Sequence, residues 1–278
     1  MTLTLAATPL GNPGDASPRL KAAIESAEII AAEDSRRFHR LASDLGVTFT
    51  AKIISFFDGN ETARTEEVLQ FLQAGKRVLV VSDAGMPTIS DPGFRLTRDA
   101  IALNIPIVVI PGPSAPTMAL ALSGLATDRF TFEGFLSRSA GARASHLESL
   151  RFEERTMIFF EAPHRITECL ADAVETFGGD RQGAICREMT KTYEETVRGS
   201  LEELLAWSKS KEILGEITMV IAGVPAGSAI KTAEEMVARV REFESAGMDR
   251  KEAIATVAKE FELPKKVVYA AVVDASKS

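Results

Sequence analysis

The sequence has few of the residues that build metal centres and disulfide frameworks. It contains two cysteines and three histidines in 278 residues, and they are too scattered for a zinc site. No apolar run approaches the roughly 20 residues that cross a bilayer, and the first residues have no basic segment typical of a signal peptide. We therefore expect no metal and no membrane segment, with Cys169 and Cys186 as free thiols in the reducing cytoplasm.

The overall composition is that of an ordinary globular protein. The chain is 45% hydrophobic and 26% charged, and it is long enough for about two domains. A formal net charge of −7 argues against indiscriminate binding of nucleic acid, although it leaves room for a local basic cleft. The function must therefore be sought in local motifs.

Strand-like and helix-like segments alternate over residues 1–124. The expected strands are residues 2–8, 28–32, 77–82 and 105–110, and the expected helices are one opening at Ser17-Pro18 and residues 65–74, 94–103 and 114–123. Residues 77–81 are rich in β-branched valine and do not alternate with polar residues, which is typical of a strand buried on both faces. Asp91-Pro92 reads as the N-cap and first position of the helix over 94–103. The alternation predicts an α/β domain with a doubly wound, mostly parallel sheet.

The pattern changes over residues 125–224. The expected strands are residues 130–135, 156–162, 183–188, 194–199 and 216–222, and the expected helices are residues 142–150, 166–177 and 201–209. No helical segment separates Glu188 from Glu194, so the strands on either side should form a hairpin. This predicts a second α/β domain with a mixed sheet.

A small helical tail is expected over residues 225–278, after a linker at 224–228. Residues 232–235 and 249–252 fit the capping-box spacing, and Pro264 can open a last helix. Three short helices resemble a helix-turn-helix, but a bundle that packs on the body or on a second subunit fits equally well. The tail has nine basic and nine acidic residues, so its net charge does not decide between the two.

Loops at three strand ends combine glycine, proline and polar residues. They span residues 8–15, 82–93 and 111–115, and none has the GxGxxG spacing of a dinucleotide fold. Each alone could be an ordinary turn. Because the carboxyl ends of parallel strands meet at one edge of a sheet, the three loops together predict a ligand cleft there.

Eight short motifs follow one another in the order and spacing of a known family. They are "TPLGNPGD", "AAEDSR", "SDAGMPTISDPG", "PGPSA", "FEGFL", "FFEAPHR", "REMTKTYEE" and "GEITMVI". In these motifs the chain resembles the bacterial 16S ribosomal RNA (cytidine-2′-O)-methyltransferases of the tetrapyrrole-methylase superfamily. The resemblance covers residues 8–221 and extends weakly into the tail.

The resemblance implies a homodimeric enzyme with the two-domain tetrapyrrole-methylase fold, which holds S-adenosylmethionine in the cleft between its domains. Its substrate would be a decoding-centre cytidine of 16S ribosomal RNA, presented in the assembled 30S subunit. Carried over by position, the cofactor residues are Pro9, Leu10, Asp83, Gly85, Pro87, Thr88, Ser114, Ala115, Phe160, Arg187, Glu216 and Ile217. Asp83 could instead form an Asx-turn that only orders its loop.

Transfer to a ribose hydroxyl needs a proton acceptor, because this hydroxyl is a poor nucleophile near neutral pH. Acidic candidates within the shared motifs are Asp34, Glu133, Glu161 and Glu188. Each could instead form an ion pair with a neighbouring arginine or lysine. The sequence does not choose among them.

Two basic stretches are candidate contacts for RNA phosphates. Their side chains are Arg36, Arg37, His39, Arg40, Arg138 and Arg143. For the first stretch a solvated helix face is an equal alternative. The second stretch is less basic than we expect in this family, and the turn at Glu262 lacks an expected glycine.

Two other functions remain open at this level. A methyltransferase acting on a corrinoid or tetrapyrrole would share the cofactor loops. A non-catalytic RNA-binding or assembly protein could retain the fold. The "AAEDSR" and "FFEAPHR" motifs and the helical tail favour the RNA enzyme.

Overall fold

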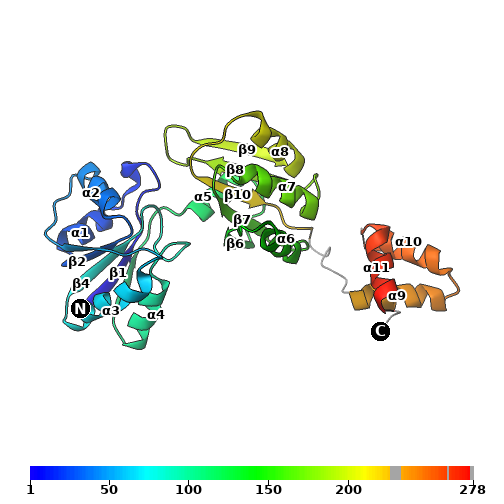
Figure 1. Cartoon of the computed structure of the whole chain (residues 1–278), viewed down its shortest axis with the longest axis horizontal. Coiled ribbons are helices and arrows are strands. Elements are labelled where there is room, and N and C mark those ends of the chain that lie inside the picture. Colours follow the sequence, from blue (N-terminus) through cyan, green and yellow to red (C-terminus); the bar gives the residue numbers. More distant parts are fainter. Residues whose placement is uncertain (226–232, 262, 276–278) are drawn as a thin grey trace.

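The computed structural model describes residues 1–225, 233–261 and 263–275. In these ranges the chain forms two five-stranded sheets covered by helices, followed by a tail of three helices (Figure 1). The predicted two-domain α/β fold with a helical tail is confirmed. No helix in the described part of the chain is long and apolar enough to cross a membrane.

The first sheet is entirely parallel, with the strand order β3-β2-β4-β1-β5. Its strands are β1 (Thr2–Ala6), β2 (Ile29–Ala32), β3 (Lys52–Ser55), β4 (Arg77–Val81) and β5 (Ile107–Ile110). Strand β4 is buried from Val78 onward, as its unalternated pattern predicts. Strand β3 was not predicted from the sequence, because only two apolar residues lie between the lysine and the serine at its ends.

Helices cover both faces of this sheet, which confirms the doubly wound arrangement. They are α1 (Pro18–Ser26), α2 (Ser35–Asp44), α3 (Glu61–Gln73) and α4 (Phe94–Ala102). Leu20 of α1 and Phe38 of α2 belong to the core on one face. Leu72 of α3 and Leu96 of α4 belong to the core on the other. Ser17 caps α1 by accepting a hydrogen bond from the Leu20 backbone N–H, as predicted.

The start of α4 differs from the prediction. Its N-cap is Gly93, with φ of 124°, and Asp91-Pro92 lies in the preceding loop. There the Pro92 carbonyl accepts a hydrogen bond from Thr88 at 3.3 Å, and Glu61 of α3 accepts one from the Gly93 N–H at 2.9 Å. Asp91 therefore lies before the helix, and its side chain bonds to Ser82 instead of capping α4.

The second sheet is mixed, with the strand order β6-β7-β10-β8-β9. Its strands are β6 (Phe130–Phe135), β7 (Thr156–Glu161), β8 (Gln182–Arg187), β9 (Glu195–Ser200) and β10 (Ile217–Ile221). β6 and β7 run parallel, and the other pairs are antiparallel. The predicted hairpin is confirmed as β8 and β9.

Helices α6 (Ala140–Ser149), α7 (Ile166–Phe177) and α8 (Leu201–Ser210) share one core with this sheet. A separate cluster joins the sheet to α5 (Ala115–Ser123), where Leu120 packs with Ile158 and Val220. Helix α5 thus packs on the second sheet, although the predicted first domain runs to residue 124. The packing favours a boundary before α5, in the segment 111–114.

The tail consists of α9 (Ala233–Ser245), α10 (Arg250–Glu260) and α11 (Lys265–Ala275), which share an apolar core (Figure 1). Asp249 caps α10 by accepting a hydrogen bond from the Lys251 N–H. The predicted cap at Thr232, the middle of the linker and the turn at Glu262 lie outside the described residues.

Candidate active site between the two sheets

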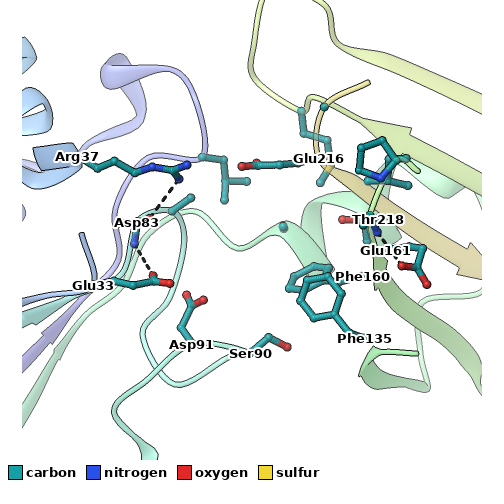
Figure 2. A pocket seen from close by; sticks show the side chains of 18 residues that line it. Glu33, Arg37, Asp83, Ser90, Asp91, Phe135, Phe160, Glu161, Glu216 and Thr218 are labelled. Atoms are coloured by element: carbon teal, nitrogen blue, oxygen red, sulfur yellow. Dashed lines mark hydrogen bonds and ion pairs between the residues drawn. The ribbon is translucent and has the colours of Figure 1, made fainter. Parts of the chain in front are cut away.

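A cavity of about 390 Å³ lies where the carboxyl edge of the first sheet faces the second sheet (Figure 2). One wall comes from loops of the first sheet and includes Glu33, Asp83 and Asp91. The other wall comes from β7 and β10 and includes Phe160 and Thr218. This volume is typical of small-molecule sites, and its place matches the cleft predicted from the strand ends.

The loop over residues 82–93 is held by backbone hydrogen bonds to the first strand's loop. Thr8 and Gly85 exchange both N–H···O bonds, at 2.9 and 3.1 Å. Gly85 has φ of +78°, and a Cβ there would lie 3.3 Å from Leu10 Cδ2. Thr88 and Ser90 also have positive φ, which is unfavourable for residues with side chains. The surrounding contacts therefore fix this loop in a strained shape facing the cavity.

Asp83 joins its loop to helix α2. Its carboxylate accepts a hydrogen bond from the Asp34 N–H at 3.0 Å and pairs with Arg37 at 3.2 Å. The Asp83 N–H in turn donates to Glu33 at 3.0 Å. Burial raises the pKa of both Asp83 and Glu33. An Asx-turn alone does not describe Asp83, because its carboxylate accepts a hydrogen bond from Asp34, which lies 49 residues away in the sequence.

Asp91 is the acid that the sequence analysis missed. It lines the cavity below Glu33 and Asp83 (Figure 2). Burial, followed by the negative charge of Glu33, raises its pKa to about 7. Its "SDPG" context is a common helix start, and only the long-range contacts of the loop show that it faces the cavity.

The opposite wall is more apolar. Phe160 lies edge-on to Phe135, with ring centroids 5.5 Å apart, and to Phe132 at 4.9 Å. Met189 and Ile217 add further apolar surface. Among its polar residues, Glu216 pairs with Lys191 at 2.9 Å.

Half of the cofactor residues carried over by resemblance line this cavity. They are Leu10, Asp83, Ala115, Phe160, Glu216 and Ile217. The others do not line it, and they are Pro9, Gly85, Pro87, Thr88, Ser114 and Arg187. Arg187 instead pairs with Glu195 at 3.1 Å and donates to the Leu214 carbonyl.

Among the acids named from the sequence, Glu161 lines the cavity, but its carboxylate is fully buried and occupied. It accepts hydrogen bonds from the Ala162 N–H at 2.7 Å and from Cys169 Sγ at 2.8 Å, and it lies 3.5 Å from Arg165. Burial and the bond to Glu161 raise the pKa of Cys169 to about 12. Through these contacts the Glu161 carboxylate stabilises the turn between β7 and α7.

The other three acids lie outside the cavity lining. Asp34 caps α2, and its hydrogen bonds to Arg36 lower its pKa to about 2. Glu133 pairs with His146 at 3.2 Å and bonds to Thr131. Glu188 pairs with Lys191 at 3.0 Å. Asp34 and Glu188 thus have the arginine or lysine partner left open above, whereas Glu133 is engaged by a histidine and a threonine.

The candidate RNA contacts differ in exposure and in their partners. Arg36, Arg37, Arg40 and Arg138 are exposed, but Arg36 pairs with Asp34 at 3.1 Å and Arg37 pairs with Asp83 in the cavity wall at 3.2 Å. Arg143 is only 5% exposed and pairs with Asp172 at 2.5 Å. Its guanidinium does not reach the surface, so we leave Arg143 out of the RNA contacts.

Several solved structures share this two-sheet architecture. The methyltransferase CobJ matches with a TM-score of 0.60 and 18% identity, over 80% of this chain and 94% of its own. A uroporphyrin-III-C-methyltransferase from Thermus thermophilus matches with a TM-score of 0.56 and 17% identity, over the same shares. Diphthine synthase matches with a TM-score of 0.59 and 14% identity, over 80% and 89%. These likenesses define the class of fold.

Sequence relatives define the family within that class. Proteins named "Ribosomal RNA small subunit methyltransferase I" are 48% identical in Mycobacterium tuberculosis, over 92% of this chain and 88% of the relative, and 41% identical in Synechocystis, over 96% and 95%. The Pseudomonas aeruginosa protein of that name is 40% identical over 96% and 95%. The chain belongs to the family of Tetrapyrrole (Corrin/Porphyrin) Methylases, which matches residues 2–205, and within it to the group of these relatives.

Proposed function

We propose that this protein transfers a methyl group from S-adenosylmethionine to the ribose 2′-oxygen of a decoding-centre cytidine in 16S ribosomal RNA. The names of its relatives support methylation of small-subunit ribosomal RNA. The observation that supports the chemistry is the cavity itself, where an acidic, preformed loop faces an apolar wall across a space of cofactor size.

The residues of the cavity fit a cationic cofactor with an adenine ring. Asp83 and Glu216 supply carboxylate oxygens for an ammonium group, although each also pairs with a cation, Arg37 or Lys191. Phe160 and Ile217 supply apolar surface for a ring. Gly85 removes a side chain at the loop's closest approach to Leu10. A Thermus thermophilus structure of the same fold is complexed with S-adenyl homocysteine, at 14% identity and a TM-score of 0.56.

The cofactor supplies an activated methyl group, so the chain must orient the reacting groups, exclude water and accept a proton. We assign the proton to Asp91, which lines the cavity and has a pKa near the operating pH. Glu161 is a positioning residue, because its oxygens already bind Ala162, Cys169 and Arg165. Arg36, Arg40 and Arg138 are the exposed cations proposed to contact the RNA backbone.

The test uses small ribosomal subunits from a strain that lacks the gene. The purified protein and labelled cofactor should place one methyl group on a ribose, identified by mass spectrometry after nuclease digestion. Protein-free 16S RNA should accept less methyl than assembled 30S particles. Labelling of a base, or transfer to uroporphyrinogen with none to RNA, would overturn the proposal in favour of the alternatives.

A further inference from the structure

The tail has a groove that the proposed chemistry does not use. It has a volume of about 550 Å³ and lies between the first turns of α10 and α11. Four cations line it, namely Arg250, Lys251, Lys265 and Lys266. The exposed ring of Tyr269 lies on the same surface, with 59% of the residue accessible.

The four cations are not explained by helix stability. The N-terminus of a helix carries partial positive charge, so it favours acidic residues and disfavours lysine and arginine. Helix α9 follows this rule with Glu234 and Glu235 in its first turn. Helix α11 begins instead with two lysines and has no acid in its first turn, and α10 begins with Arg250 and Lys251.

Most of this charge is also unpaired. Within the described residues, Arg250 lies 3.8 Å from Glu244, while Lys251, Lys265 and Lys266 have no ion-pair partner. Asp249, which caps α10, lines the groove, and Glu252 lies beside it in the first turn of α10. The basic and acidic residues of the tail balance in number, yet the cations gather on one surface.

We propose that this groove, lined by the four cations and Tyr269, binds a single-stranded segment of the RNA substrate, with phosphates on the lysines and one base stacked on Tyr269. The inference rests on the proposed function. Lysine and arginine neutralise phosphates, and an exposed aromatic ring beside them suits an unpaired base. Duplex RNA fits less well, because its major groove is too narrow for a helix to enter.

The experiment measures binding of the full chain to a labelled, mixed-sequence single-stranded RNA of about 16 nucleotides, by fluorescence anisotropy at low and moderate salt. The double variant Lys265→Glu/Lys266→Glu should bind at least about 10-fold more weakly and show a smaller salt dependence. The control Arg241→Glu/Lys259→Glu changes the same charge on exposed residues outside the groove, and it should stay within about twofold of wild type.

A second pair of variants tests the aromatic ring. Tyr269→Leu should weaken binding about 5- to 50-fold, and Tyr269→Phe, which keeps the ring, should restore it. Duplex RNA should be less sensitive to this pair. Circular dichroism confirms folding, and Lys265→Gln/Lys266→Gln replaces any double variant that fails this check.

The outcomes separate the groove from the catalytic proposal. Equal RNA affinity in wild type and groove variants, or equal losses in groove and control variants, would overturn the inference. So would a groove-dependent binding to anionic lipid vesicles without an effect on RNA. If the wild type methylates no ribosomal RNA, the proposed function fails, while these binding constants still decide the groove. Cofactor affinity should be unchanged in every tail variant.

Discussion

The central cavity and the tail groove have opposite charge. The cavity places Glu33, Asp83 and Asp91 on one wall, whereas the groove gathers three lysines and an arginine. The net charge of −7 describes neither surface. Local charge therefore tells more than the total, because a cationic cofactor and an anionic polymer need opposite potentials in one molecule.

Removing the carboxylate of Asp91 from the cavity wall should have the largest effect. Asp91→Asn should lower the rate of methyl transfer about 10²- to 10⁴-fold, the usual contribution of a general base, with cofactor affinity within about threefold. In wild type, kcat/KM should rise with pH and level off above about 7, because Asp91 must be ionised. The variant's profile should be flat.

A matched control for Asp91 is Asp99→Asn on α4, where the carboxylate pairs with Arg98 on the surface. Both changes remove one negative charge of the same shape. If Asp91→Asn transfers methyl groups at the wild-type rate, a group other than Asp91 accepts the proton. It would also leave the acidic wall as a cofactor surface only.

The next largest effect is expected at Asp83, which joins the loop over residues 82–93 to α2. Asp83→Asn should weaken cofactor binding about 10- to 100-fold, as expected for a charged hydrogen-bond acceptor. Calorimetry gives the affinity, and thermal melting without cofactor gives the stability. A lower melting temperature with unchanged affinity would make Asp83 a structural residue, through its bonds to Asp34 and Arg37.

A third prediction concerns the pH dependence of stability that Asp91 gives to the acidic cavity wall. The pKa of Asp91 in the folded chain, about 7, exceeds its unfolded value near 4, so ionisation costs stability as pH rises between these values. Without cofactor, Asp91→Asn should therefore gain about 3 kcal/mol relative to wild type between pH 4.5 and pH 8. Urea unfolding at both pH values measures it. A constant difference would show that Asp91 is well solvated.

The smallest effect tests the shape of the loop. Gly85→Ala and Gly46→Ala both place a side chain at positive φ, but an added Cβ meets Leu10 at 3.3 Å only in the first. Each should lose about 1 kcal/mol of stability from backbone strain. Gly85→Ala alone should also lose cofactor affinity, by about threefold or more. Equal affinities in the two variants would place the cofactor away from this turn.

The sequence predicted the elements whose residues repeat a strong local pattern. The β-branched strand at 77–81 and the capped helix after Ser17 are confirmed. Helix α2 and strand β3 were not predicted, because α2 is mostly polar and β3 has only two apolar residues between a lysine and a serine. Their positions depend on packing against neighbours distant in the sequence.

The cavity could be placed from the sequence, but its proton acceptor could not. Three loops at strand ends located the cleft, and six residues carried over by resemblance line it. Asp91 was misread as a helix cap, because the bonds that turn it inward come from Glu61 and Thr88. Glu161 was located, yet its engagement with Cys169 and Arg165 is a property of the folded core.

Helix α5 determines where this chain could be divided into two fragments. Its first residue lines the cavity, while Leu120 is buried against the second sheet. A fragment ending at residue 124 would carry α5 with its apolar face exposed, and the remaining fragment would lose the helix that covers its sheet. Division in the segment 111–114 would leave both halves with their own core, so these two pieces should reassociate and rebuild the cavity at their junction.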